Sequence, residues 1–237
     1  MILFKKIPIN ACKQSLLKDF NTVQKHWITH FNTEFYNGDW SGIPLRSPAV
    51  KSHPLSAGMG FEDEFVDESL FSKLTYTRDI TKRIYTEKLS IRYLRLTPGS
   101  EIKLHADHDM IFWDGLVRLH IPVLTNNKVL FEVNNELVNM QAGECWFADF
   151  SKPHRVYNGG DTDRIHLVID CKVNTWLKDL FIKEGIICKN EQKPDPISNY
   201  TEEEKEALIK SLLEINSETA LEMARNLSMR YNIPLPF

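Results

Sequence analysis

The sequence predicts a mainly β fold with flanking helices, built as an antiparallel jelly roll and followed by a helical hairpin. Between about residues 88 and 171, apolar and polar residues alternate over short segments separated by turn residues. Before and after that region, apolar residues recur at helical spacing. With 237 residues, 42% of them hydrophobic, the chain is long enough to bury a substantial core.

Residues 1–87 are expected to form an N-terminal helix and loop region that packs on this core. Apolar residues at helical spacing predict one amphipathic helix over 13–31. Residues 32–60 are rich in Gly, Pro, Ser and Asn, which favours a loop or short strands. Long structureless segments of this kind often form lids or substrate walls. Residues 61–85 predict one or two short helices.

The core is expected to span residues 88–175. Each predicted strand has apolar residues at alternate positions and ends at a turn signal, such as the Pro-Gly pair at 98–99. On the polar face of one strand, Arg118 and His120 are neighbours. In chain order the strands are "LSIRYLRL", "GLVRLHIPVL", "VLFEV", "ELVNM", "ECWFAD", "HRVYN" and "RIHLVID".

Residues 176–237 return to helical spacing and are expected to form a C-terminal helical region. A polar, Pro-containing linker covers 190–199. Thr201 and Glu204 have the spacing of a capping box at the start of a helix, and Ser217 can cap a second one. The sequence does not indicate what this hairpin does.

Charge and composition exclude several classes of protein. A formal net charge of −3 leaves no basic footprint for nucleic acid and no polybasic segment for anionic membranes, so neither is an expected partner. No signal-peptide layout and no apolar run of about 18 residues is present, so a cytoplasmic location is expected. Cys12, Cys145, Cys171 and Cys188 form no CxxC pair, which favours reduced core thiols.

Two separated histidines and an aspartate suggest a metal site. On a strand, His105 and Asp107 of "KLHADHD" would point to the same side, and His154 of "SKPHRVYN" would supply a third ligand. Two histidines and one carboxylate fit Fe(II) with open positions, although zinc or manganese would also accept them. His108 is a competing ligand, but strand alternation would point its side chain to the opposite face from His105. The alternative is that these are ordinary polar residues at a sheet edge.

Arg164 strengthens the hypothesis of an active site. It opens the last predicted strand, ten residues after His154. A guanidinium group can hold the far carboxylate of a dicarboxylate cosubstrate through two parallel hydrogen bonds. The alternative is a salt bridge between Arg164 and Asp107, Asp149 or Asp170.

Four stretches together resemble the aspartyl/asparaginyl β-hydroxylase family of Fe(II)/2-oxoglutarate-dependent oxygenases, and within it the compact bacterial members similar to L-proline cis-4-hydroxylases. The stretches are "SIRYLRLTPGSEIKLHADHD", "VRLHIPVLTN", "GECWFADFSKPHRVYN" and "RIHLVID". The resemblance implies a double-stranded β-helix, which is a cupin-like jelly roll and agrees with the strand pattern. It implies hydroxylation of an unactivated C–H bond in an amino acid or in an aminoacyl or peptidyl residue.

The resemblance also implies roles for individual residues. His105, Asp107 and His154 become the iron ligands, and Arg164, Arg118 and His120 contact 2-oxoglutarate. We expect Arg92, Trp113 and Arg46 to contact the substrate, which is a small molecule or peptide that carries a carboxylate. O2 is the second cosubstrate and ascorbate should help in vitro.

Two other functions remain open at this point. One is a cupin-like metal enzyme that does not use 2-oxoglutarate, and the other is a non-catalytic ligand-binding protein. The identity of the substrate, the position of hydroxylation and the oligomeric state do not follow from the sequence.

Overall fold

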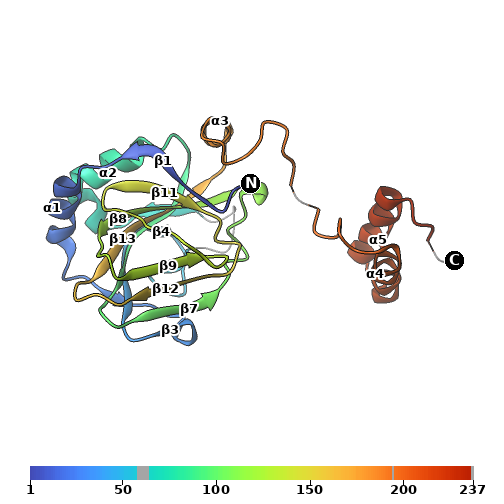
Figure 1. The fold of residues 1–237 in the computed structure, drawn as a ribbon, viewed down its shortest axis with the longest axis horizontal. Helices are drawn as coiled ribbons and strands as arrows, with labels where there is room; N and C mark the ends of the chain where they lie inside the picture. Colours follow the sequence, from blue (N-terminus) through green and yellow to red (C-terminus); the bar gives the residue numbers. More distant parts are fainter. Residues whose placement is uncertain (58–63, 194, 236–237) are drawn as a thin grey trace. The chain divides into compact units, whose positions relative to one another are not determined.

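A computed structural model describes residues 1–57, 64–193 and 195–235 of the chain. The contacts divide it into two compact units, Met1–Glu191 and Gln192–Phe237. The first unit holds the sheets, and the second is a pair of helices (Figure 1).

Two antiparallel sheets build the first unit. The larger contains β1 (Phe4–Asn10), β2 (Ile28–Thr29), β4 (Trp40–Pro48), β5 (Phe65–Asp67), β6 (Lys88–Leu96), β8 (Leu116–Leu124), β11 (Glu144–Ala148) and β13 (Arg164–Lys172). The smaller contains β3 (Tyr36–Asn37), β7 (Glu101–His105), β9 (Val129–Val133), β10 (Glu136–Leu137) and β12 (His154–Asn158). The larger sheet has the order β1-β11-β8-β13-β6-β4-β2, with β5 beside β4, and the smaller has the order β10-β9-β12-β7-β3.

From β6 onward, successive strands pass back and forth between the two sheets. β6, β8, β11 and β13 belong to the larger sheet, whereas β7, β9, β10 and β12 belong to the smaller one. This alternation makes the double-stranded β-helix, or jelly roll, and confirms the predicted fold class. Each predicted strand of this region has a counterpart in the structure.

The segment expected to be a loop or short strands contains a long strand that the sequence does not reveal. β4 lies within residues 32–60 and pairs along its length with β6, with Ile43 opposite Tyr93. Its residues are mostly buried on both faces, so they do not alternate between apolar and polar. Pro44, which suggests a turn, lies where the register shifts between β4 and β6, as prolines within sheets do. Of the two expectations for this segment, a loop or short strands, the strand holds over Trp40–Pro48, and it is longer than expected.

Helices cover one face of the larger sheet. They are α1 (Lys13–Val23), α2 (Thr75–Lys82) and α3 (Thr175–Lys183), and short 3-10 turns lie at η1 (Thr33–Phe35), η2 (Ser69–Lys73) and η3 (Phe112–Asp114). The helix predicted over 13–31 ends at Val23, because Ile28–Thr29 turns into an edge strand on β4. Residues 58–63, which cover the end of the predicted segment 32–60 and the start of the predicted helical segment 61–85, are outside the described residues.

Alternation along the central strands separates two environments. Side chains on one face form the main core under the helices, among them Ile91, Tyr93, Leu119, Ile121, Ile165, Leu167 and Ile169. Leu177 and Phe181 of α3 belong to this core, so the first unit continues past the core boundary predicted at residue 175. The opposite face, turned toward the smaller sheet, carries the buried polar side chains Arg92, His120, Arg164, His166 and Asp170.

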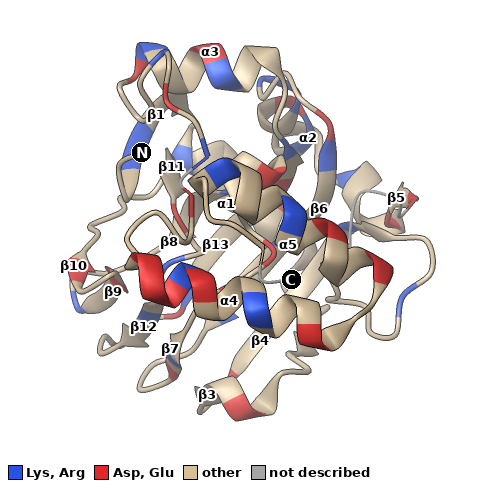
Figure 2. Ribbon diagram, turned by 90° about the vertical axis from the view of Figure 1, so that its right-hand side faces the viewer, with Lys and Arg blue, Asp and Glu red and all other residues tan. Residues whose placement is uncertain are grey.

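The second unit is the predicted helical hairpin. α4 (Glu202–Ile215) begins with the predicted capping box between Thr201 and Glu204, and Ser217 caps α5 (Glu218–Tyr231). Acidic residues gather at the start of α4 (Figure 2), where they complement the helix dipole. Ile209, Ala224 and Ile233 form its small core.

The helices and the cysteines bear on two expectations from the sequence, a chain without a membrane span and reduced core thiols. Within the described residues, no helix is long and apolar enough to cross a membrane. All four cysteines are free. Cys145 and Cys171 are buried as expected, but Cys12 and Cys188 are exposed and do not belong to the core.

Candidate metal centre

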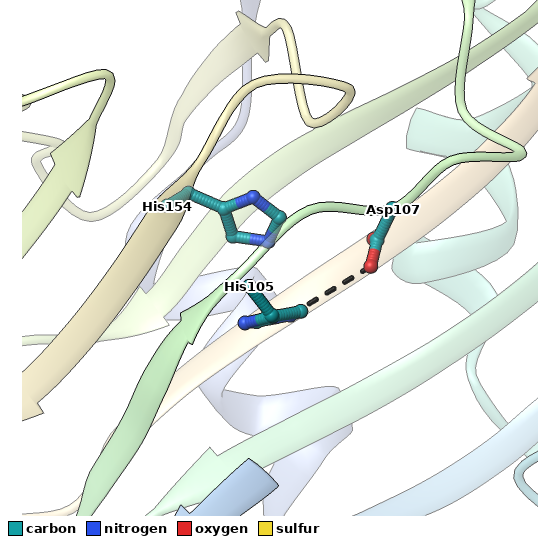
Figure 3. A group of neighbouring side chains, drawn as sticks. All are labelled: His105, Asp107 and His154. Atoms are coloured by element: carbon teal, nitrogen blue, oxygen red, sulfur yellow. Dashed lines mark ion pairs between the residues drawn. The ribbon is translucent and has the colours of Figure 1, made fainter.

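Three potential metal ligands meet where β7 ends and β12 begins (Figure 3). His105, the last residue of β7, lies directly opposite His154, the first residue of β12. Asp107 follows shortly after β7, and one ligand atom from each of the three side chains lies within 4.8 Å of the others. The His105 Nε2 and Asp107 Oδ1 atoms are 3.7 Å apart, the contact drawn as a dashed line in Figure 3.

Strand alternation was expected to orient Asp107, but other contacts do so in the structure. β7 ends at His105, so strand alternation does not orient Asp107. Its backbone N–H instead donates to the carbonyl oxygen of Phe150 at 2.9 Å, and its carboxylate pairs with Arg118. His108, which was expected to face away, lines the same cavity but is not part of the cluster.

Backbone carbonyls orient both imidazole rings. Nδ1 of His105 lies 2.8 Å from the carbonyl oxygen of Lys103, and Nδ1 of His154 lies 2.9 Å from that of Lys152. A carbonyl can only accept, so each Nδ1 carries the proton and each Nε2 has a free lone pair. Burial lowers the pKa of His154 to about 4, which keeps its ring neutral. This is the arrangement that metal-binding histidines require.

A charge-balanced network lies beside the cluster. Arg118 donates from Nε to Asp170 at 2.6 Å and from Nη1 to Asp107. Arg92 donates to the same Asp170 at 3.2 Å and to Ser90 Oγ at 2.9 Å. Burial alone would raise the pKa of Asp170, but Arg118 and Arg92 outweigh it and hold the pKa below its ordinary value. Two cations and two anions therefore compensate one another within the chain.

Arg164 has no such compensation. It is 2% exposed, and among the described residues no acidic side chain pairs with it, so the predicted alternative of a salt bridge with Asp107, Asp149 or Asp170 does not occur. Its Nη2 lies 3.0 Å from Nδ1 of His166, and its Nε has no partner. Burial lowers the pKa of Arg164.

His120 lies next to this cation. Its Nδ1 is 3.2 Å from Nδ1 of His166, and its ring stacks on Phe150 with centroids 4.8 Å apart. Its Nε2 is buried without a hydrogen-bond partner among the described residues. Arg164 and His120 thus present unused polar atoms in a buried setting, which is what a polar ligand would satisfy.

Several of these groups line one cavity of about 820 Å³. It includes the three potential ligands, and from the larger sheet it includes Arg92, Arg118, His120 and Arg164. Leu94, Ile102, Phe131, Phe150 and Val156 supply apolar walls. The volume lies in the range of roughly 300–1,000 Å³ that is usual for small-molecule sites.

Two of the predicted substrate contacts lie outside the described lining of this cavity. Arg46 forms an ion pair with Asp67 at 2.7 Å and donates to the carbonyl oxygen of Lys88, and it is not among the described residues that line the cavity. Trp113 packs against the main core beside Phe112, again outside the described cavity lining. Both lie on segments whose direction depends on tertiary packing, so local spacing could not place them.

The sequence reasoning missed part of the opposite wall. His30 and Trp40 line the cavity and stack with ring centroids 3.5 Å apart. Neither residue falls in a sequence motif. Trp40 belongs to β4, whose amino-acid composition is typical of a loop. Only the pairing of β4 with β6 brings this wall to the metal ligands.

Comparison with known proteins finds a family and several relatives. Residues 15–173 match the family model for aspartyl/asparaginyl β-hydroxylases. An L-proline cis-4-hydroxylase of Rhizobium meliloti (strain 1021) is 24% identical over 204 residues, covering 82% of this chain and 69% of the relative.

Solved structures with a related architecture are more distant. A 2-oxoglutarate–Fe(II) oxygenase family protein from Burkholderia pseudomallei is 10% identical with a TM-score of 0.44, covering 67% of this chain and 79% of its own. A viral collagen prolyl hydroxylase from Paramecium bursaria Chlorella virus 1, in complex with 2-oxoglutarate, is also 10% identical with a TM-score of 0.44, covering 73% and 97%.

Proposed function

The chain belongs to the aspartyl/asparaginyl β-hydroxylase family of 2-oxoglutarate-dependent oxygenases, as its sequence motifs predict, and we propose that it uses Fe(II) to hydroxylate an amino acid or an aminoacyl or peptidyl residue. One observation carries the proposal. Arg164 is a buried cation without an anionic partner among the described residues, in the same cavity as a cluster of two histidines and a carboxylate.

The cluster suits Fe(II) in its chemistry. His105 and His154 offer Nε2 atoms whose tautomers are set by backbone carbonyls, and Asp107 offers a carboxylate oxygen. Two histidines and one carboxylate on one side leave the other coordination positions open for a cosubstrate. Arg118 holds the Asp107 carboxylate from behind, so we assign it a part in orienting this ligand.

The deep end of the cavity suits 2-oxoglutarate. Arg164 would hold the distal carboxylate, for which a guanidinium group is the matching donor. His120, whose ring lies beside His166 and Phe150, would pack against the same molecule. When bound, Fe(II) and 2-oxoglutarate supply the oxidising chemistry that hydroxylates an unactivated C–H bond, with O2 as the second cosubstrate. The surrounding apolar side chains, such as Phe131 and Phe150, exclude water from that end.

The buried charges favour a substrate with a carboxylate. Asp107 and Asp170 compensate Arg92 and Arg118, and the two charges of 2-oxoglutarate would compensate those of Fe(II). The charge of Arg164 then remains in excess in the buried part of the cavity. A carboxylate on the substrate, near Arg92, would restore neutrality.

Succinate release tests the proposal. The full chain is incubated with Fe(II), 2-oxoglutarate, O2 and ascorbate, together with L-proline, the other common amino acids and short peptides. We expect Arg164→Ala to abolish turnover of 2-oxoglutarate while the metal still binds, and Arg155→Ala, an exposed arginine paired with Glu132, to behave as wild type.

Metal titration completes the test. His154→Ala should weaken Fe(II) binding by about 100-fold or more, because it removes a ligand outright. His108→Ala, in the same cavity but outside the cluster, serves as the matched control. Metal binding without 2-oxoglutarate turnover would favour a cupin-like enzyme that does not use this cosubstrate, and the absence of both would favour a ligand-binding protein.

A further inference from the structure

His30 is held rigidly in the wall of the cavity by two aromatic rings. Its imidazole stacks on Trp40 with centroids 3.5 Å apart and planes at 9°, and on Phe31 at 4.8 Å and 14°. Its backbone N–H donates to the carbonyl oxygen of Trp40 at 2.9 Å, and its own carbonyl accepts from the Tyr36 hydroxyl at 3.2 Å. The ring is thus placed before any ligand arrives, which is the condition for a precise contact.

The hydrogen bonds of His30 determine which nitrogen carries the proton. The backbone N–H of Asn32 donates to Nδ1 at 3.3 Å. A neutral imidazole has one acceptor and one donor nitrogen, so Nε2 carries the proton. Burial, aided by the charge of Arg92, lowers the pKa of His30 to about 3. The ring therefore remains a neutral Nε2–H donor at physiological pH.

The Nε2–H group has no partner among the described residues and faces the cavity. No described residue accepts a hydrogen bond from this group. His30 Nε2 is also not one of the fully buried side-chain atoms that lack a hydrogen-bond partner. His30 is only 7% exposed and lines the cavity, so its remaining exposure is toward that space. A buried donor of this kind needs an acceptor, and here a bound molecule must supply it.

The surroundings indicate which acceptor fits. The excess positive charge of Arg164 in the same cavity favours an anion over a cation in front of His30, because Asp170 and Asp107 already compensate Arg92 and Arg118. Most of their donor capacity is already used by Asp170 and Asp107. An ammonium group would find no acceptor on His30, because Nδ1 is occupied by Asn32.

We propose that His30 is a specificity-determining residue, whose Nε2–H donates a hydrogen bond to a carboxylate oxygen of an amino-acid substrate. This inference rests on the proposed function. His30 supplies the directional contact, and the excess positive charge of the cavity supplies the attraction. The pocket accordingly binds a free amino acid more tightly than its carboxamide, whose NH2 group meets another donor.

Calorimetry on a matched pair of variants tests the inference. His30→Phe keeps a flat ring in the stack and removes the donor. His53→Phe is the control, because His53 contacts Phe31 from outside, accepts from the N–H of Leu55 and is not among the described cavity-lining residues. The full chain is loaded anaerobically with Fe(II) and 2-oxoglutarate, and the common L-amino acids and their carboxamides are titrated.

We expect the amino acid that binds wild type best to bind His30→Phe about 10- to 100-fold more weakly, the usual effect of losing a hydrogen bond to a charged group. In His53→Phe the dissociation constant should change by less than about twofold. Equal affinity in His30→Phe and wild type overturns the inference. So does the failure of every amino acid to bind, or a carboxamide that binds as tightly as its acid.

Nitrogen NMR on the wild-type protein gives a second measurement that does not depend on the variant folding. The Nε2–H signals of His30 should shift when the best amino acid binds, while Nδ1 stays unchanged. Unchanged Nε2 signals overturn the inference. The binding of 2-oxoglutarate is measured first: if it fails, the proposed function fails, whereas binding and turnover with no effect at His30 refute this inference alone.

Discussion

Arg118 and Arg164 lie on neighbouring strands of the same sheet face, and their surroundings are opposite. Arg118 on β8 is held by two carboxylates, Asp107 and Asp170. Arg164 on β13 meets no carboxylate among the described residues and bonds only to His166. The difference separates two uses of a buried cation. A compensated arginine holds neighbouring groups in place, and an uncompensated one is available to an incoming anion.

The largest effect is expected from removing Asp170, the carboxylate that Arg92 and Arg118 share. Asp170→Asn leaves Arg92 and Arg118 buried with less compensation, so we expect the free energy of unfolding to fall by about 3–5 kcal/mol. Urea denaturation measures the loss. Asp67→Asn breaks the exposed pair with Arg46 and should cost less than about 1 kcal/mol. If both variants lose the same amount, the buried network has no special role.

Replacing Arg118 and Arg164 in turn tests the compensated and the uncompensated arginine directly. Arg118→Met takes one partner from Asp170 and one from Asp107, and should lower the free energy of unfolding by about 2–3 kcal/mol. Arg164→Met removes a buried charge that has no partner, so stability should stay within about 1 kcal/mol of wild type or rise. Thermal or urea denaturation of the metal-free protein compares them. A larger loss for Arg164→Met would reverse the assignment.

The pH dependence of Asp170 sharpens the first prediction. Its pKa is lower in the folded protein than in the unfolded chain, so folding releases a proton and the stabilisation is complete above the unfolded value of about 3.9. As pH falls below about 4, wild type loses this contribution and Asp170→Asn does not. The stability difference should be constant from about pH 5 to 8 and narrow by about 1 kcal/mol toward pH 3. A constant difference down to pH 3 would contradict the assignment.

The smallest expected effect concerns the residue that holds Arg164. His166→Leu removes the acceptor 3.0 Å from Nη2 and frees the guanidinium group. We expect about a tenfold weaker binding of 2-oxoglutarate, measured by calorimetry with the metal present, because orientation and not charge is lost. Binding as tight as in wild type would mean that packing alone orients Arg164.

The sequence predicts the core fold well because alternation is a local property. The strands of the larger sheet between residues 88 and 171 bury one set of side chains under helices and present the other to the smaller sheet, so their alternating pattern is visible in the sequence. β4 has no such pattern, because it is buried on both faces. β1 is likewise missed, since it is an edge strand without a strong apolar alternation.

The site is predicted less completely because strand register is not a local property. Asp170 was one possible partner for Arg164, six residues away on the same strand. In the structure Asp170 lies opposite Arg118, and His120 lies opposite Val168. Pairing across strands decides which charge meets which, and a sequence alone does not specify it. The same limit explains why Trp113 and Arg46 were placed in the cavity and His30 was not.

The position of β13 has a consequence for how the protein is made. β13 is the last strand along the chain, yet it lies in the middle of the larger sheet, between β8 and β6. During synthesis, Arg92 and Arg118 emerge from the ribosome long before Asp170, and the gap between their strands stays open until residue 172 is free. Contacts so distant in sequence are slow to form. We therefore expect the nascent chain to gain protease resistance only after β13 has emerged, in a single late step that completes the sheet and the catalytic cavity together.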